Sequence, residues 1–248
     1  MDIRPAARLE SGVIERHNRI LATITHDLKS PMVAIMGSAQ FMLKDMKEKP
    51  HDPRWEEMLL IIQRAGDGML SMIEDILAMA KMEAGSEMVE TDWAADPAEE
   101  LRDVVRTFGF EAAAKEIALD IDLPWTLPAV RWDMRRIRVH VINNLVSNAL
   151  KFTPKGGRVS LSAVPADGAV QIRVSDTGPG ISPAERERIF CLFEQAEMKN
   201  SRVFKGAGLG LYNARLFVTR HGGTVTVEES GGIGTTFLIT LPLDAERR

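Results

Sequence analysis

The segment NNLVSNALKFTP, at Asn143–Pro154, is the most informative part of this 248-residue sequence. Two glycine motifs follow it along the chain, DTGPG from Asp176 and GAGLGL from Gly206. Each motif alone is weak evidence, because glycines beside a phosphate-binding loop recur on many folds. In this order, the three motifs predict a pocket for a nucleotide and a metal ion. A fourth motif, THDLKSP around His26, lies far upstream and supplies a side chain with which a nucleotide can react.

The composition limits the class of protein. With 45% hydrophobic and 27% charged residues, the chain is typical of a globular protein rather than a disordered one. A net charge of -4 provides no basic field for nucleic acid or an anionic membrane. Cys191 is the only cysteine, which excludes an internal disulfide and fits the reducing cytoplasm. No apolar run approaches the ~20 residues of a membrane span, so we expect no membrane segment in this chain.

Residues 1–86 are predicted to form a helical hairpin. One apolar series lies between residues 21 and 46, and another with similar spacing lies between residues 55 and 79. Two prolines favour a loop over residues 47–53, between the two series. Two helices cannot bury so wide an apolar face, so we expect a homodimer that forms a four-helix bundle. Docking of this face against the rest of the chain is the alternative. Steps of three and four, typical of such bundles, alternate along Trp55, Met58, Ile62, Ala65, Met69, Met72, Ile76 and Met79.

His26 lies off this apolar series. A lone histidine on a helix is usually a solvated surface residue, but the neighbours of His26 favour a catalytic role. Asp27 can accept the Nδ1 proton and leave Nε2 as a nucleophilic lone pair. Ser30 and Pro31 follow, and the proline frees the carbonyl of Asp27, so the helix should loosen beside the histidine. On these four residues alone, both interpretations stay open.

Residues 87–248 are predicted to form a second domain with a mixed α/β layer. Gly85 suits the left-handed cap of the preceding helix, and residues 86–97 break the helical period as a linker that leads into a first strand. His221 is expected to close the last helix, where a partly positive imidazole suits the helix dipole. Helices are expected at 97–114, 133–152 and 209–221. Strands are expected at 117–123, 158–164, 169–175, 224–229 and 235–241.

Three polar side chains share one face of the helix that contains the first motif. Asn144 and Asn148 are four residues apart, and Lys151 continues this face by one turn. An amide oxygen suits Mg²⁺ that is held mostly by phosphates and water, and the lysine can neutralise phosphate charge. Asparagines can instead cap or bridge neighbouring elements, but two of them on an apolar face are costly unless they are satisfied. We therefore favour a metal and phosphate site.

The glycine motifs supply the rest of the predicted pocket. Asp176 ends a strand, and its carboxylate can accept the exocyclic amine of adenine. Gly178 and Gly180 allow a close backbone approach, although in isolation an ordinary strand-to-turn sequence is the better explanation. In GAGLGL, glycines precede a helix whose free N–H groups can face phosphates. Residues 182–205, between these motifs, are predicted to form a lid over the nucleotide.

Together these motifs resemble the transmitter core of bacterial two-component sensor histidine kinases, over nearly the whole chain. THDLKSP resembles the phosphoacceptor motif of that family, and NLVSNALKFTP resembles its asparagine-rich box. DTGPGI and GAGLGL resemble the two glycine boxes, IFCLFEQ the phenylalanine box, and GIGTTF the late glycine–threonine turn near the base. The chain differs from the family at Asp27, which is usually glutamate, and at Ser30, which is usually threonine or asparagine.

The resemblance implies an α+β architecture. A helical hairpin would form a dimeric four-helix bundle, followed by a Bergerat-type (GHKL) α/β sandwich that binds ATP and Mg²⁺. His26 would be the phosphoacceptor, with Asp27 and Ser30 as its catalytic neighbours, and Asn148 would be the metal ligand. The implied nucleotide-binding residues are Asn144, Asn148, Lys151, Phe152, Asp176, Gly178, Gly180, Gly206, Gly208, Leu209, Gly210 and Thr236.

The resemblance also implies partners. These are a second copy of the chain, the receiver domain of a response regulator, and an upstream sensor domain or protein, with no nucleic acid. Two rival classes stay open, namely an ATPase of the same fold, as in heat-shock chaperones and type II topoisomerases, and an inactive dimeric scaffold. The histidine motif argues against the first class, and the complete set of pocket residues argues against the second.

Overall fold

The structure is a computed structural model that describes residues 28–42, 54–83, 92–94, 96–192, 194, 208–228 and 234–245. The chain divides into two compact units, Met1–Leu77 and Ala78–Arg248. His26, Asp27 and Gly206 lie outside the described residues. The domain boundary predicted after residue 86 stays a prediction.

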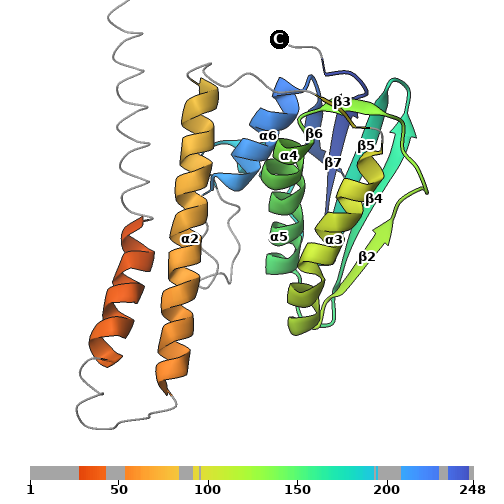
Figure 1. The fold of residues 1–248 in the computed structure, drawn as a ribbon. Helices are drawn as coiled ribbons and strands as arrows, with labels where there is room; N and C mark the ends of the chain where they lie inside the picture. Colours follow the sequence, from red (N-terminus) through yellow and green to blue (C-terminus); the bar gives the residue numbers. More distant parts are fainter. Residues whose placement is uncertain are drawn as a thin grey trace, which may run out of the picture. The chain divides into compact units, whose positions relative to one another are not determined.

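The first unit contains two helices that lie side by side (Figure 1). One covers residues 28–42, and the other, α2, covers Arg54–Glu83 and continues past the end of the unit. Glu56 and Glu57 occupy the first turn of α2, where acidic side chains suit the positive end of the helix dipole. The guanidinium of Arg54 lies 5.1 Å from the centre of the Phe41 ring, so a cation–π contact joins the two helices.

The apolar surface of α2 is only partly covered within one chain. A row of large side chains on this helix stays exposed, with exposed fractions of 56% at Leu59, 58% at Leu70 and 53% at Leu77. The helix over 28–42 also exposes large apolar side chains. The hairpin therefore leaves an apolar surface that one chain does not bury. The members of the predicted series with described side chains are half-buried: Trp55, Met58, Ile62, Ala65, Met69, Met72 and Ile76.

The second unit is a two-layer sandwich, with helices on one face of a five-stranded sheet (Figure 1). The sheet has the strand order β2-β4-β5-β7-β6. The pair β2–β4 is parallel, and the other pairs are antiparallel. The predicted α/β sandwich is confirmed. The strands are β2 (Ala118–Asp122), β4 (Arg158–Ala166), β5 (Ala169–Asp176), β6 (Thr224–Val227) and β7 (Thr235–Pro242).

The core lies between the sheet and the helices. Successive side chains of a strand point to opposite faces, so each central strand buries alternate residues. On β7 the buried apolar residues are Phe237, Ile239 and Leu241. The helix α3 (Pro97–Ala114) adds Leu101 and Val104 to the same core. It begins where the predicted helix begins, because a proline is tolerated in the first turn.

A continuous helical segment carries the first sequence motif. It consists of α4 (Met134–Arg136), η1 (Ile137–Ile142) and α5 (Asn143–Phe152). The side chain of Asp133 caps its start by accepting a hydrogen bond from the N–H of Arg136. η1 is a turn of π-helix, in which the N–H of Asn143 bonds to the carbonyl of Arg138. The predicted helix over 133–152 is confirmed, with an irregular turn that the periodicity did not predict.

The last helix, α6 (Gly210–Arg220), packs against η1 and β6. His221 is its C-cap residue and closes the helix as predicted, but this residue is fully buried. The Nδ1 atom of His221 lies 2.8 Å from the carbonyl oxygen of Phe217, and Nε2 accepts the N–H of Asp133 at 3.0 Å. Burial lowers the pKa of His221. The prediction of a partly positive imidazole is therefore wrong, because this site holds the neutral ring.

Two short strands form a separate antiparallel sheet, β1 (Asp92–Ala94) with β3 (Val130–Trp132). Neither strand was predicted: β1 lies within residues 86–97, which were expected to form a linker, and no strand was expected near β3. A strand of three residues is too short to show a period of two, so the sequence gives no signal for it. Trp132 is buried, and its indole N–H donates to the carbonyl oxygen of Pro242, which joins this small sheet to β7.

Candidate nucleotide-binding site

Asp176 ends β5, and backbone donors fix its side chain. Oδ1 accepts hydrogen bonds from the N–H of Gly178 at 2.7 Å and from the N–H of Thr235 at 3.3 Å. Burial raises the pKa of Asp176, and the bonds from Gly178 and Thr235 oppose this rise because they stabilise the carboxylate. A half-buried carboxylate held in this way is a directional acceptor for an N–H group of a ligand.

Glycines line the wall beside Asp176 because no side chain fits there. A Cβ on Gly178 would lie 2.8 Å from Oδ1 of Asp176 and 3.0 Å from the carbonyl oxygen of Phe152. Gly234 has φ +85°, and a Cβ there would lie 2.0 Å from the carbonyl oxygen of Asp176. A Cβ on Gly180 would lie 3.1 Å from the carbonyl oxygen of Gly234. The end of α5, the end of β5 and the start of β7 therefore meet at this wall.

Two asparagines on the predicted polar face of α5 have different surroundings. Nδ2 of Asn144 donates to the carbonyl oxygens of His140 at 2.9 Å and of Gly210 at 3.4 Å. Its amide therefore bridges η1 and the start of α6. Asn148 lies one turn later on the same face and is half-buried. Among the described residues, none forms a hydrogen bond with the side chain of Asn148.

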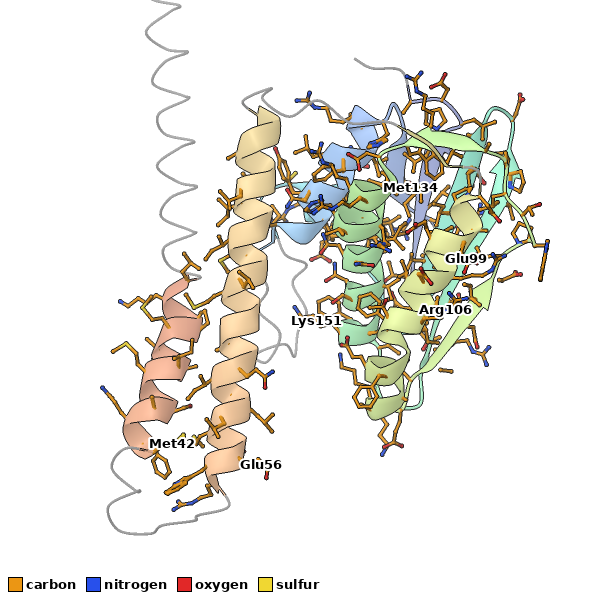
Figure 2. The ribbon with its side chains drawn as sticks, viewed as in Figure 1. Met42, Glu56, Glu99, Arg106, Met134 and Lys151 are labelled. Atoms are coloured by element: carbon orange, nitrogen blue, oxygen red, sulfur yellow. The ribbon has the colours of Figure 1, made fainter. Side chains whose placement is uncertain are left out.

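Lys151 lies in the last turn of α5 (Figure 2). Its Nζ lies 5.2 Å from the centre of the Phe152 ring. Burial lowers the pKa of Lys151, and the positive charge of Lys115 lowers it further. Within the described ranges, no acidic side chain forms an ion pair with Lys151. Its ammonium group is therefore available to neutralise an anionic ligand.

The start of α6 offers backbone N–H groups. Gly208 has φ +69°, a conformation that favours glycine, and it leads the chain into the helix. Leu209 is the N-cap residue, and it is almost fully buried. No side chain of the described residues caps this helix. A helix N-terminus without a side-chain cap leaves its first N–H groups for another acceptor, such as a phosphate.

The threonine beside Asp176 is Thr235 rather than the predicted Thr236. Thr235 is buried, and both its N–H and its side chain bond to Asp176. Thr236 lies on the opposite face of β7, where its Oγ1 donates to Oγ of Ser175 at 2.9 Å. Adjacent residues of a strand face opposite sides, so only one of the two can contact the pocket. The sequence contains a signal for this choice, because Phe237 is a core residue. Thr235 lies two residues before Phe237 and shares its face of β7, whereas Thr236 lies on the other face.

The segment predicted as a lid, residues 182–205, begins with an anchored turn. Ile189 and Phe190 are buried, and the rings of Phe190 and Phe237 meet edge to face with centroids 6.1 Å apart. The guanidinium of Arg215 lies 5.3 Å from the centre of the Phe190 ring and forms an ion pair with Glu187 at 3.0 Å. A movable lid therefore stays a prediction only for the part after residue 192.

The predicted phosphoacceptor region is described only in part. Ser30 is exposed on the helix over residues 28–42, and Pro31 follows it within the same helix. The carbonyl that this proline would leave without its usual donor belongs to Asp27, which lies outside the described residues, so the loosening expected there stays a prediction. His26 and Asp27 precede the described part of this helix, so their predicted roles stay predictions.

Two protein families match the chain. Residues 16–85 match the family described as His Kinase A (phospho-acceptor) domain. Residues 133–245 match the family described as Histidine kinase-, DNA gyrase B-, and HSP90-like ATPase. Histidine protein kinase DivJ of Caulobacter vibrioides is 38% identical over 226 residues, which cover 91% of this chain and 37% of DivJ. The chain belongs to the sensor histidine kinases.

Solved structures of other histidine kinases resemble this one. Full-length ShkA, in complex with AMPPNP, has a TM-score of 0.67 and 29% identity, and the match covers 92% of this kinase and 46% of the ShkA chain. Histidine kinase ThkA, in complex with response regulator protein TrrA, has a TM-score of 0.70 and 22% identity, over 100% of this chain and 69% of that one. The second likeness concerns the fold alone. This kinase therefore spans about a third of the length of DivJ and about half of ShkA.

None of the helices described for this kinase has the length and apolar character needed to cross a bilayer. The family match over residues 133–245 begins at Asp133 and includes α5, Asp176 and α6, so the nucleotide pocket predicted from the motifs lies within an ATPase domain.

Proposed function

We propose that this kinase transfers the γ-phosphoryl group of ATP to Nε2 of its own His26, and then to an aspartate in the receiver domain of a response regulator. One observation carries the proposal: a phospho-acceptor domain that includes His26 and an ATPase domain with the pocket around Asp176 occur in the same chain. An ATPase of the same fold does not require the first domain, and an inactive scaffold does not require the second.

Asp176 supports the choice of an adenine nucleotide. Its fixed carboxylate can accept the exocyclic N–H of adenine. Guanine carries a carbonyl oxygen at the corresponding position, which would place a second acceptor against the half-buried carboxylate instead of a donor. Thr235 bonds to the same carboxylate and orients it. Gly178 and Gly234 keep the wall free of side chains, which allows a flat ring to approach the backbone.

The start of α6 and the end of α5 provide the phosphate-binding groups in this proposal. No described side chain caps α6, so its first N–H groups can donate to phosphate oxygens. Lys151 supplies a positive charge that has no acidic partner within the described ranges. Phosphoryl transfer depends mainly on positioning and charge neutralisation, and these are the properties that the two helix ends supply.

We assign Asn148 to Mg²⁺. The described residues contain no group of three or more His, Cys, Asp and Glu side chains that could hold a metal ion. A single neutral amide oxygen instead fits an ion that takes its other ligands from phosphates and water. When bound, Mg²⁺ would neutralise charge on the phosphate oxygens. Asn148 has no hydrogen-bond partner among the described residues, so its amide oxygen is available for this role.

The transfer step forms a P–N bond between Nε2 of His26 and the γ-phosphorus, and it breaks the bond from that phosphorus to the bridging oxygen of ADP. Asp27 accepts the Nδ1 hydrogen in a hydrogen bond and so keeps Nε2 as the nucleophile. Ser30 is exposed on the helix that follows, and we assign its hydroxyl to orienting a water molecule when the receiver is dephosphorylated.

The same proposal includes a homodimer. Leu59, Leu70 and Leu77 form an exposed apolar row that a second hairpin would bury in a four-helix bundle. An upstream sensor domain or protein would supply the signal. We place the chain in the cytoplasm, because ATP is available there and because the exposed free thiol of Cys191 suits a reducing compartment.

Incubation of the chain with γ-labelled ATP tests the proposal. We expect an acid-labile and base-stable label in the unmodified chain, since a P–N bond has that stability, and no label in His26→Gln. Asn148→Ala and Asp176→Asn should each reduce labelling while the dimer stays intact. Acid-stable label, or label that persists in His26→Gln, would refute the assignment. ATP hydrolysis without label would favour an ATPase of the same fold, and no ATP binding at all would favour a scaffold.

A further inference from the structure

Asn144 joins the start of α6 to the helical segment that carries Asn148. Its Nδ2 donates to the carbonyl oxygen of His140 in η1 at 2.9 Å and to that of Gly210, the first residue of α6, at 3.4 Å. The amide group of Asn144 therefore connects the irregular turn η1 to the N-terminus of α6, where the proposed function places phosphate. Asn148, on the same face, forms no such bridge to any described residue.

Gly210 leaves room for this close approach. A Cβ at this position would lie 3.1 Å from Oδ1 and 3.3 Å from Cγ of Asn144. The amide group of Asn144 or the first turn of α6 would have to shift by a few tenths of an ångström. Alanine is otherwise a better helix former than glycine, so any loss caused by Gly210→Ala would come from this contact.

Two other contacts hold the rest of α6 to the same segment. The rings of Phe217 and His140 are stacked, with centroids 4.4 Å apart and planes inclined by 7°. At the far end, Nε2 of His221 accepts the N–H of Asp133 at 3.0 Å. The body of α6 is therefore fixed independently of Asn144. Loss of the Asn144 bridge should release the first turn of the helix without unfolding the domain.

We propose that Asn144 is a positioning residue for the kinase reaction. It sets the place of the first turn of α6 relative to Asn148, and it binds neither Mg²⁺ nor phosphate itself. Its Nδ2 is used on two carbonyl oxygens, and its Oδ1 lies against the backbone of Gly210. The inference rests on the proposed function, and it assigns the two asparagines of one helix face to different tasks.

Binding of a nonhydrolysable ATP analogue to the full chain, measured with and without Mg²⁺, tests this assignment. Asn144→Ala is expected to raise Kd about tenfold in both conditions, because phosphate-binding N–H groups would be displaced. The matched control, Asn148→Ala, is expected to raise Kd only when Mg²⁺ is present. A loss confined to the Mg²⁺ condition in Asn144→Ala would overturn the inference.

Asn144→Asp provides a second variant with nearly the same shape. A carboxylate cannot donate to the carbonyl oxygens of His140 and Gly210, so a positioning role predicts weaker binding with and without Mg²⁺. A metal ligand would respond in the opposite direction, because a carboxylate binds Mg²⁺ more strongly than an amide. Tighter binding of the analogue with Mg²⁺ in this variant would therefore overturn the positioning role.

A double-mutant cycle with Gly210→Ala tests the contact itself. In the unmodified chain, Gly210→Ala should raise Kd for the analogue about tenfold, because the new Cβ displaces the amide of Asn144. In the Asn144→Ala background the same change should alter Kd by less than about twofold, since the amide is gone. Equal factors in the two backgrounds would show that the residues act independently and would refute the bridge.

Amide hydrogen exchange without nucleotide separates this inference from the proposed function. The N–H of Asn213 donates to the carbonyl oxygen of Leu209 in the first turn of α6, and the N–H of His221 donates to that of Phe217 at the other end. Asn144→Ala should speed exchange about tenfold at Asn213 only. Unchanged exchange would overturn the inference. If exchange accelerates while Asn148→Ala leaves nucleotide binding unaltered with Mg²⁺, the proposed metal site fails instead.

Discussion

His221 should make the stability of the second unit depend on pH. Its ring is fully buried, and the neutral form with a proton on Nδ1 satisfies both of its contacts, to the carbonyl of Phe217 and the N–H of Asp133. A second proton, on Nε2, would face the donor of Asp133. Burial lowers the pKa of His221, and the charge of Arg136 lowers it further, against opposing effects of Phe217 and Asp133. The folded state therefore binds this proton less readily than the unfolded state.

The sign of the effect follows from this difference. Because the folded pKa is depressed, the contribution of neutral His221 is fully present above the unfolded pKa of about 6.5 and is lost as the pH falls towards the folded pKa. The free energy of unfolding should fall by at most about 1.4 kcal/mol per pH unit in this window. The loss between pH 8 and pH 5 is then no more than about 2 kcal/mol, a limit reached when the folded ring stays neutral throughout.

Denaturant unfolding at pH 5 to 8, followed by tryptophan fluorescence, to which the buried Trp132 contributes, measures this loss. His221→Phe removes the titrating group and leaves the N–H of Asp133 without its acceptor, so it should cost about 1–3 kcal/mol at pH 8. The stability difference between the two proteins should then shrink as the pH is lowered, because only the unmodified chain loses the contribution of His221. A difference that stays constant from pH 8 to pH 5 would refute the reasoning.

Other variants test the pocket and the dimer. Thr235→Val should raise the Kd of an ATP analogue about tenfold, because the hydrogen bond to Asp176 is lost. Thr236→Val should leave this Kd unaltered, and equal Kd values for the two variants would contradict the pocket assignment. Gly234→Ala should lower the calorimetric melting temperature by several degrees or more, because its Cβ would overlap a carbonyl oxygen, and an unchanged temperature would exclude this contact. Leu70→Glu with Leu77→Glu should give monomers by light scattering, and a dimeric mass would disprove the apolar interface.

Most of the second unit could be predicted from the sequence because its main elements are long and periodic. β4, β5 and β7 alternate buried and less buried residues over seven or eight positions, which is enough to distinguish a strand from a helix. The strand β3 is too short for that test. The π-helical turn η1 also leaves no trace in the pattern, since Ile137, Val141 and Ile142 are apolar whether the turn has an α or a π hydrogen bond.

The hairpin could be predicted in outline, but the structure was needed to show which of its apolar residues are half-buried within one chain and which are exposed. The sequence predicts one wide apolar face on α2, which contains Met58, a member of the alternating series, and Leu59, which widens this face. In the structure Met58 is half-buried, while Leu59 is 56% exposed. The difference arises because the helix over 28–42 covers only part of the width of α2. Periodicity gives the width of an apolar face, whereas the position of the neighbouring helix decides which rows are left for a partner.

The chemical types of the pocket residues could be predicted, but their partners could not. Thr235 and Thr236 are identical in type, and only the direction of β7 decides which one reaches Asp176. Asn144 and Asn148 are likewise identical and share a helix face, yet only Asn144 meets Gly210, which lies 66 residues away in the sequence.

Such a contact joins residues that are distant in the sequence and adjacent in the fold. The spacing of residues within one motif carries no information about it. A motif therefore identifies which residues meet at a site without assigning a task to each. For this kinase the consequence is practical, because loss of activity in variants of either Asn144 or Asn148 would leave their tasks undistinguished. The two roles separate only when Mg²⁺-dependent binding is compared with Mg²⁺-independent binding, since a metal ligand affects the first alone and a positioning residue affects both.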